Sequence, residues 1–202
     1  MRALLLGLAL GSISSAAWAV NPLLGKVEIS PASRVERDAG VWVDGQYMGY
    51  VRHLSGKDRL VLLPGEHDLV FKLVGFEDVA SRITVEPGSK VDYRLQMQQR
   101  EGVTYPEKDA TAKLRLNVEP EEAAIFVNQT YVGHVDRFNG PKGMRLAPGD
   151  YRFTIALPGY RSFETSLTVH ANQTYEVKTK LQAAALDEQA PGLTTEGETA
   201  MR

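Results

Sequence analysis

An internal repeat constrains the fold of this 202-residue chain more than any other feature of its sequence. The segment 41–51 aligns with 125–135 at an offset of 84 residues, and the alignment continues without a gap. Glycines, turn prolines and apolar positions coincide at the same offset, as Pro64-Gly65 does with Pro148-Gly149. Self-similarity at a fixed spacing indicates one structural unit that is used twice. We therefore expect two copies of a domain of about 70 residues, each with a small core.

A β-hairpin is predicted near the start of each copy. In the first, Asp44-Gly45 follows the apolar strand 41–43 and suits a type I′ turn, whose two central residues both need positive φ. In the second, Asn128-Gln129 takes that place, where Asn tolerates the left-handed region and Gln fits less well than Gly. Return strands are predicted over 47–51 and 131–135.

The next strands are predicted over 60–63 and 144–147, and the Pro-Gly pairs that follow them favour type II turns. Apolar and polar residues then alternate, which is typical of strands that bury one face. The side chains expected to point inward are His67, Leu69, Phe71 and Leu73 in the first copy and Tyr151, Phe153, Ile155 and Leu157 in the second. The predicted fold class is all-β.

The order of these signals resembles the PEGA domain family of small β-sandwich modules. Each copy has a strand, a Val-Asp-Gly-like turn, an aromatic residue and Gly, then a Pro-Gly turn, and a strand ending in Gly-Phe or Gly-Tyr. The segment 118–124 is similar to the Pro-x-x-Ala start of the family, with Glu122 where the family prefers Gly. The resemblance covers 26–99 and 113–182. It implies two tandem β-sandwich modules with a binding or scaffolding role outside the cytoplasm, and the family has no catalytic residues to carry over.

The first residues read as an export signal. Arg2 precedes the apolar run 3–10, and Ala17-Trp18-Ala19 fits the small-x-small cleavage pattern. Serines interrupt the run before it reaches the length of a membrane-spanning helix. We expect 1–19 to be a signal peptide cleaved after Ala19. The mature chain is then expected in the bacterial periplasm, without a membrane span.

Two further segments lie outside the repeated units. Residues 100–112 combine Gly, Pro and mixed charge, which is typical of a linker. Residues 183–202 have few large apolar side chains and are predicted to be a disordered acidic tail. The formal net charge of −2 argues against a general nucleic-acid binder, and the absence of cysteine excludes disulfides and thiolate sites.

No motif in the sequence predicts catalysis. The four histidines show no metal-ligand spacing, and neither a nucleophile elbow nor a phosphate-binding glycine loop is present. His67 stands at the start of a strand, where a half-buried packing role is favoured over a ligand role. We therefore expect a protein that is not an enzyme and that has no cofactor and no metal site.

A basic loop at the same place in both units supplies the first candidates for contact with a partner. In each loop an apolar residue, Leu54 or Phe138, stands among cations. Such a loop could meet an acidic partner or an anionic wall polymer. The favoured alternative is a solvated loop whose apolar residue completes the core. The candidates are Arg52, Lys57 and Arg59 in the first loop and Arg137, Phe138, Lys142 and Arg145 in the second.

Trp42 and Phe126 align with each other and are the remaining candidates for partner contact. Strand alternation points both rings away from the core that their neighbours fill. Packing between the two copies is favoured, and an exposed platform for sugar or protein is the alternative.

Two functions are compatible with these features. The leading hypothesis is a non-catalytic periplasmic binding or adaptor protein whose tandem β-modules contact another envelope protein. The alternative is a cell-wall or carbohydrate-binding protein that uses the paired aromatic residues and basic loops. Neither the oligomeric state nor the relative orientation of the two units follows from the sequence.

Overall fold

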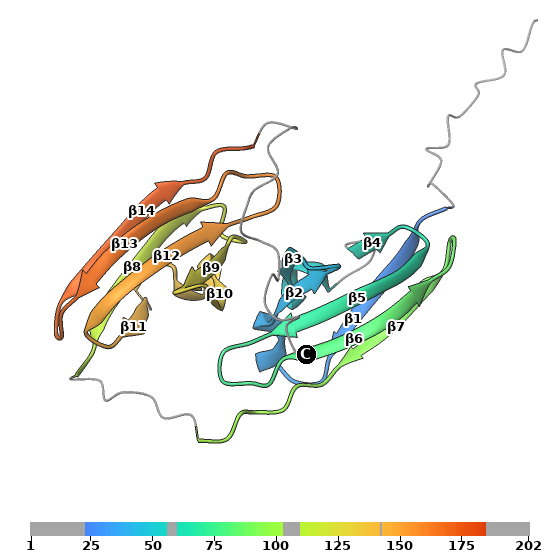
Figure 1. Cartoon of the computed structure of the whole chain (residues 1–202), viewed down its shortest axis with the longest axis horizontal. Coiled ribbons are helices and arrows are strands. Elements are labelled where there is room, and N and C mark those ends of the chain that lie inside the picture. The colour runs from blue at the N-terminus through green and yellow to red at the C-terminus, as the bar shows by residue number, and fades with distance from the viewer. Residues whose placement is uncertain (1–22, 56–59, 103–109, 142, 185–202) are drawn as a thin grey trace, which may run out of the picture.

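A computed structural model describes residues 23–55, 60–102, 110–141 and 143–184, which form two β units (Figure 1). The expected signal peptide 1–19 lies outside the described residues. So do 103–109 of the expected linker and 185–202 of the expected tail. No helix in the described ranges is long and apolar enough to cross a membrane.

The first unit contains two sheets. The four-stranded sheet is antiparallel, in the order β3 (Gln46–Tyr50), β2 (Gly40–Val43), β5 (Gly65–Lys72) and β6 (Val79–Val85). The three-stranded sheet has the order β4 (Leu60–Leu62), β1 (Gly25–Pro31) and β7 (Lys90–Leu95), with β7 parallel to β1. Two short helices, η1 (Val35–Asp38) and α1 (Val51–Leu54), complete the unit.

The second unit repeats this strand order. Its four-stranded sheet runs β10 (Thr130–His134), β9 (Ala124–Val127), β12 (Gly149–Ala156) and β13 (Phe163–Val169). Its three-stranded sheet runs β11 (Met144–Leu146), β8 (Ala112–Glu119) and β14 (Thr174–Lys180), again with one parallel pair. The helix α2 (Val135–Phe138) stands where α1 stands in the first unit. The prediction of an all-β fold with two β-sandwich units is confirmed.

Each unit buries its own core between its two sheets. In the first, Val27 and Ile29 of β1 pack with Leu69 and Phe71 of β5. In the second, the strands β8, β9 and β12 supply the matching apolar residues. The predicted inward residues of β5 and β12 are buried or half-buried, so the alternation in the sequence identified the core face correctly.

Local turn chemistry produced the two hairpins as predicted. Asp44 and Gly45 have φ values of 50° and 80°, and Asn128 and Gln129 have 49° and 67°. Positive φ at both central residues is what a type I′ turn requires. Gln129 therefore has a left-handed backbone conformation, which residues other than glycine, asparagine and aspartate seldom adopt.

The return strands begin and end one residue earlier than predicted. They end at Tyr50 and His134, and the next residue begins a single helical turn. The reason is tertiary. The backbone N–H of Val51 donates to the Ala39 carbonyl. The side chain of Val51 is fully buried, as is that of Val135 at the matching position. Both return strands also carry a bulge, which the sequence pattern did not reveal.

The Pro-Gly pairs differ from the predicted type II turns. Gly65 and Gly149 have φ values of 145° and 151°, whereas the third residue of a type II turn has φ near +80°. Both glycines already pair as the first residues of β5 and β12, opposite Val85 and Val169. Each glycine is already part of a strand, so its backbone is extended and a type II turn does not form.

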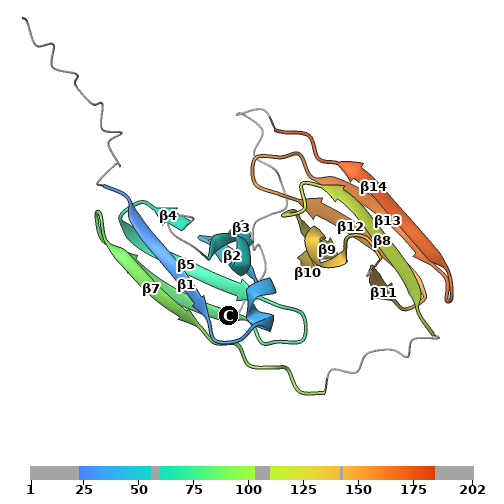
Figure 2. The same ribbon diagram turned by 180° about the vertical axis from the view of Figure 1, so that it is seen from behind.

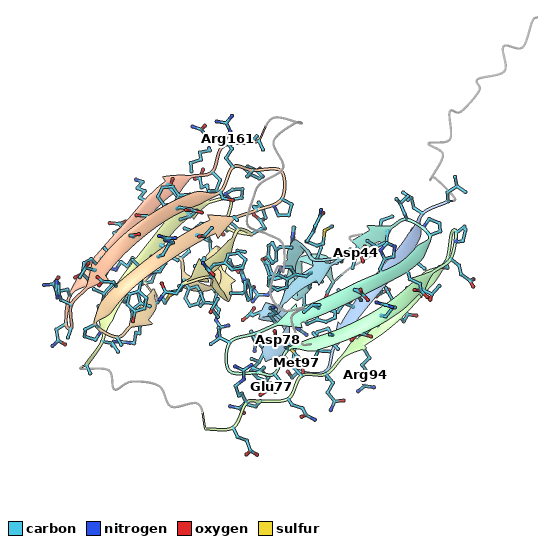
Figure 3. All side chains as sticks on the ribbon, viewed as in Figure 1. Asp44, Glu77, Asp78, Arg94, Met97 and Arg161 are labelled. Atoms are coloured by element: carbon cyan, nitrogen blue, oxygen red, sulfur yellow. The ribbon has the colours of Figure 1, made fainter. Side chains whose placement is uncertain are left out.

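In each unit, a residue that follows the last strand pairs with a residue from earlier in the same unit. Gln99 pairs with Phe76, and Ala183 pairs with Tyr160 at the matching position. In the first unit, the buried carboxylate of Glu36 in η1 accepts hydrogen bonds from the backbone N–H groups of Ser33 and Met97, at 2.8 and 2.9 Å. Figure 3 labels Met97 at this end of the first unit. Glu36 thus attaches η1 to the chain that follows β7.

Candidate functional site

The two units contact each other through equivalent surfaces. The strands β2 and β3 of the first unit lie opposite β9 and β10 of the second, as both views show (Figures 1 and 2). A third apolar cluster fills this contact and draws residues from both units. Its members are Trp42, Tyr47, Ala124, Tyr131 and Ala156, with Val70 and Phe126 packed against them. We call this contact the inter-unit interface.

Aromatic rings dominate the inter-unit interface. The indole of Trp42 meets the Tyr131 ring edge to face, with 5.2 Å between centroids, and the Phe126 ring at 6.5 Å. Such pairs are worth about 0.5–1.5 kcal/mol each beyond the burial of their area. The 84-residue offset relates Trp42 to Phe126 and Tyr47 to Tyr131. One surface patch therefore contacts its own duplicate, as in a two-fold symmetric dimer.

A second equivalent pair lies beside the aromatic cluster. The rings of Tyr50 and His134 stack in parallel, with 3.7 Å between centroids and 3° between planes. His134 has no exposed surface, and neither of its ring nitrogens has a hydrogen-bond partner among the described residues. Burial lowers the pKa of His134 to about 4. The imidazole is therefore neutral at pH 7 and serves as a flat packing surface.

A third equivalent pair is ionic. The guanidinium of Arg52 in α1 donates to Asp136 of the second unit at 3.1 Å, and it also donates to Asp38 of its own unit. Arg52 and Asp136 occupy the same position in the two copies. The Arg52 side chain is 51% exposed, so this pair contributes little to stability and mainly orients the two units.

The two basic loops do not carry equivalent charges in the part that the structure describes. Arg52 binds two carboxylates, and an acid occupies its position in the second unit. The guanidinium of Arg137 lies 5.7 Å from the Phe138 ring, and its Nη1 atom is buried. The loops differ because residues at this position complement each other across the interface. The candidates Lys57, Arg59 and Lys142 lie outside the described residues.

The apolar residues of these loops complete the two cores, as the favoured alternative held. Leu54 is 5% exposed within the first core, and Phe138 packs against the second. Arg145 lies apart from the loop, on strand β11, and donates to the Thr111 hydroxyl at 3.2 Å. The structure therefore does not gather the loop candidates into one site.

Trp42 and Phe126 pack between the units, which was the favoured interpretation of that pair. Trp42 is 2% exposed, so it cannot form a platform on the surface. Phe126 is half-buried against the same cluster. The alternative of an exposed sugar-binding platform is wrong for Trp42, because the second unit covers the indole.

His67 has a structural role, because it links the β2–β3 turn to the segment before β5. Its ring bonds the Asp44 carboxylate at 2.6 Å and the Leu63 carbonyl at 2.8 Å. The Asp44 hydrogen bond, followed by that of Leu63, raises the pKa of His67. In the second unit the hydroxyl of Tyr151 donates to the carbonyl of Ala147, at the position equivalent to Leu63. Two different side chains thus close the same turn. No three His, Asp or Glu side chains in the described ranges gather as a metal site.

Sequence reasoning missed Tyr50, His134 and Asp38 as interface residues. The first two already stood in the aligned segments, at an aromatic position shared by both copies. Their equivalence was a signal, but a strand pattern cannot show which surface faces the duplicate.

Comparison with known proteins gives one family match. Residues 111–185 match the model of the PEGA domain family, which corresponds to the second unit. A search of curated proteins found no match. The Bacillus anthracis TIE protein overlays with a TM-score of 0.25 and 14% identity, over 78% of this chain and 34% of that one. This chain thus spans about a third of that protein's length.

The solved structure of GBS52, the minor pilin of the gram-positive pathogen Streptococcus agalactiae, gives a similar result. Its TM-score is 0.26 and its identity is 9%, over 82% of this chain and 98% of that one. Both scores are low, so neither likeness carries an argument, and the family match is confined to residues 111–185.

Proposed function

We propose that this PEGA-domain protein is a non-catalytic binding or adaptor protein of the bacterial periplasm, whose two modules contact another envelope protein. The match at 111–185 and the export signal expected at 1–19 support this proposal. The first unit is proposed as a second copy of the same module. It has the same strand order, the same hairpin turn and the same bulge as the matched unit.

The observation that carries the proposal is the inter-unit interface. Domains in one chain that share a small polar contact move relative to each other. Here a stacked ring pair, an aromatic cluster and an ion pair hold equivalent surfaces together. The three-stranded sheets and the strands β6 and β13 lie away from this contact (Figure 1). One body with two separated outer flanks is suited to holding a partner in a defined geometry.

The proposal is tested by crosslinking in intact cells. The full chain with a C-terminal tag is crosslinked, captured and analysed for attached proteins. An unrelated exported protein with the same tag serves as the matched control. We expect one envelope protein to be enriched over the control. If no protein is enriched, the adaptor function is refuted.

The same experiment distinguishes the alternative functions. Wall fragments recovered without an enriched protein would favour the cell-wall-binding function. A catalytic activity that co-elutes with the chain in size-exclusion chromatography would refute a non-catalytic role.

A further inference from the structure

The outer face of the sheet β11-β8-β14 is strongly basic. Leu114, Leu116 and Val118 of β8 are buried, so the residues between them point to solvent. The outward residues are Arg145 on β11; Lys113, Arg115, Asn117 and Glu119 on β8; and Thr174, Glu176, Lys178 and Lys180 on β14. They include five cations and two carboxylates, a net charge of +3. We call these residues the basic face.

The register arranges these charges in rows across the sheet. Arg145, Lys113 and Thr174 form one row, and Arg115 lies opposite Glu176 in the next. Neighbouring strands are about 5 Å apart and alternate residues about 7 Å apart. The basic face is therefore a regular strip about 20 Å long.

Not all of these charges are held in ion pairs or hydrogen bonds. Lys180 pairs with Glu119 at 3.1 Å, and Lys113 donates to the Pro141 carbonyl. Within the part of the chain that the structure describes, Arg115 and Lys178 have no ion-pair partner. Both side chains are exposed. Their charge is available to a molecule outside the chain.

The duplicate unit shows that the fold does not require this charge. On the matching face of β4-β1-β7, Val61 stands at the position of Arg145, and Glu28 stands at that of Arg115. There Lys90 bonds both Glu28 at 2.6 Å and Asp92 at 2.8 Å. The outward residues of this face are Lys26, Glu28, Ser30, Val61, Lys90, Asp92 and Arg94, with a net charge of +1, so the same sheet is stable with a smaller charge. The cation at Arg115 therefore has no structural reason in the sheet itself.

We infer that the basic face docks against an acidic surface patch on a folded partner protein. This inference rests on the proposed adaptor function and names the surface that performs it. A regular strip of cations complements an acidic patch in charge, and such complementarity speeds association and fixes orientation. The carboxylates of Glu119 and Glu176 lie within the strip, where they would repel a uniform polyanion but can register a partner of mixed charge. The outward residues include no aromatic ring on which a sugar could stack.

The test places a photo-crosslinking amino acid at Asn117, in the middle of the basic face. The matched control places it at Ser30, on the corresponding face of the first unit. Crosslinking is done in intact cells with the full chain, and the attached peptide is identified. We expect an envelope protein attached from Asn117 and not from Ser30, through a segment rich in Asp and Glu.

Charge reversal then tests the electrostatics with the purified partner. The variant Arg115→Glu/Lys178→Glu should weaken binding about tenfold or more at low ionic strength, and by less at high salt. Arg115→Glu places on β8 the residue that β1 carries at the matching position, so the fold should tolerate it. The control variant Lys26→Glu/Arg94→Glu changes the net charge equally on the other face and should leave binding unchanged. Thermal melts verify that both variants are folded.

The first two outcomes below separate this inference from the adaptor function. If a captured envelope protein binds both variants equally, the adaptor function stands and the basic face is refuted. If Asn117 yields no protein crosslink while the chain pellets with purified sacculi in a way that Arg115→Glu/Lys178→Glu abolishes, the face binds a polyanion and the inference is overturned. If no protein is captured by any route, both proposals fail.

Discussion

Acidification should weaken the fold through His134. The ordinary histidine pKa is 6.5, and the buried ring at the inter-unit interface has a pKa of about 4. Between these values the unfolded chain binds a proton that the folded chain does not, so the free energy of unfolding falls as the pH falls. One pH unit is worth about 1.4 kcal/mol per proton. The whole window therefore corresponds to about 3 kcal/mol, present in full above pH 6.5 and lost by pH 4.

The environment of His134 explains this magnitude. Burial is the largest cause of the low pKa, because both ring faces and both nitrogens are shielded from water. The carboxylates of Asp38 and Asp136 favour the protonated ring, whereas Arg52 and Arg137 oppose it. A protonated imidazole would have to gain a hydrogen-bond partner or regain water. If the two units separate, the Tyr50 ring leaves the His134 ring and water can reach the imidazole.

Urea denaturation followed by tryptophan fluorescence measures this effect. Trp42 is the only tryptophan after residue 18, and it reports on the interface directly. The control variant His134→Phe keeps a flat ring against Tyr50 and cannot titrate. Between pH 7 and pH 4, the free energy of unfolding of this variant should fall by about 3 kcal/mol less than that of the natural chain. His67 shifts stability in the opposite direction, because its pKa is raised, but it does so equally in both proteins. Equal pH dependence of the two proteins would refute the reasoning.

Three further substitutions test other parts of the structure. Gly40→Ala would place a Cβ 2.8 Å from the Tyr131 ring across the interface, so it should cost about 1–3 kcal/mol in urea titrations; an unchanged Trp42 signal and midpoint would contradict the packing. Gln129→Gly should raise the stability by about 1 kcal/mol in thermal melts, because it relieves a positive φ; a lower melting temperature would argue against strain at that turn. Glu36→Ala should cost about 3 kcal/mol, since two backbone N–H groups lose their acceptor, and Glu36→Gln should cost less; equal losses would point to packing instead.

Much of each unit could be read from local sequence signals. The hairpin turns follow from residues that accept positive φ, and Asp44-Gly45 and Asn128-Gln129 adopt it as predicted. The buried faces of β5 and β12 follow from a two-residue alternation. These features depend on interactions within a few residues, so they can be predicted from a short segment of the sequence. The ends of the return strands do not, because Val51 and Val135 are held by buried contacts from elsewhere in the unit.

The candidate sites divide along the same line. The outward cations of β8 follow from the alternation around Leu114 and Leu116, but their cross-strand rows need the register with β11 and β14. The loop prediction grouped Arg52 and Arg137 by their places in the sequence, because a sequence pattern does not show which side chain lies opposite each of them. In the structure Arg52 meets Asp136, which is 84 residues away.

The amino-acid order was sufficient to specify two similar β-sandwich units, their turns and their inward faces, because propensity and periodicity act over short stretches of chain. It was not sufficient to specify how the units meet. Trp42, Tyr50 and Arg52 acquired their roles when the duplicate patch packed against them. That packing depends on shape and charge complementarity between two folded surfaces. Such complementarity exists only after each unit has folded, so no local pattern records it.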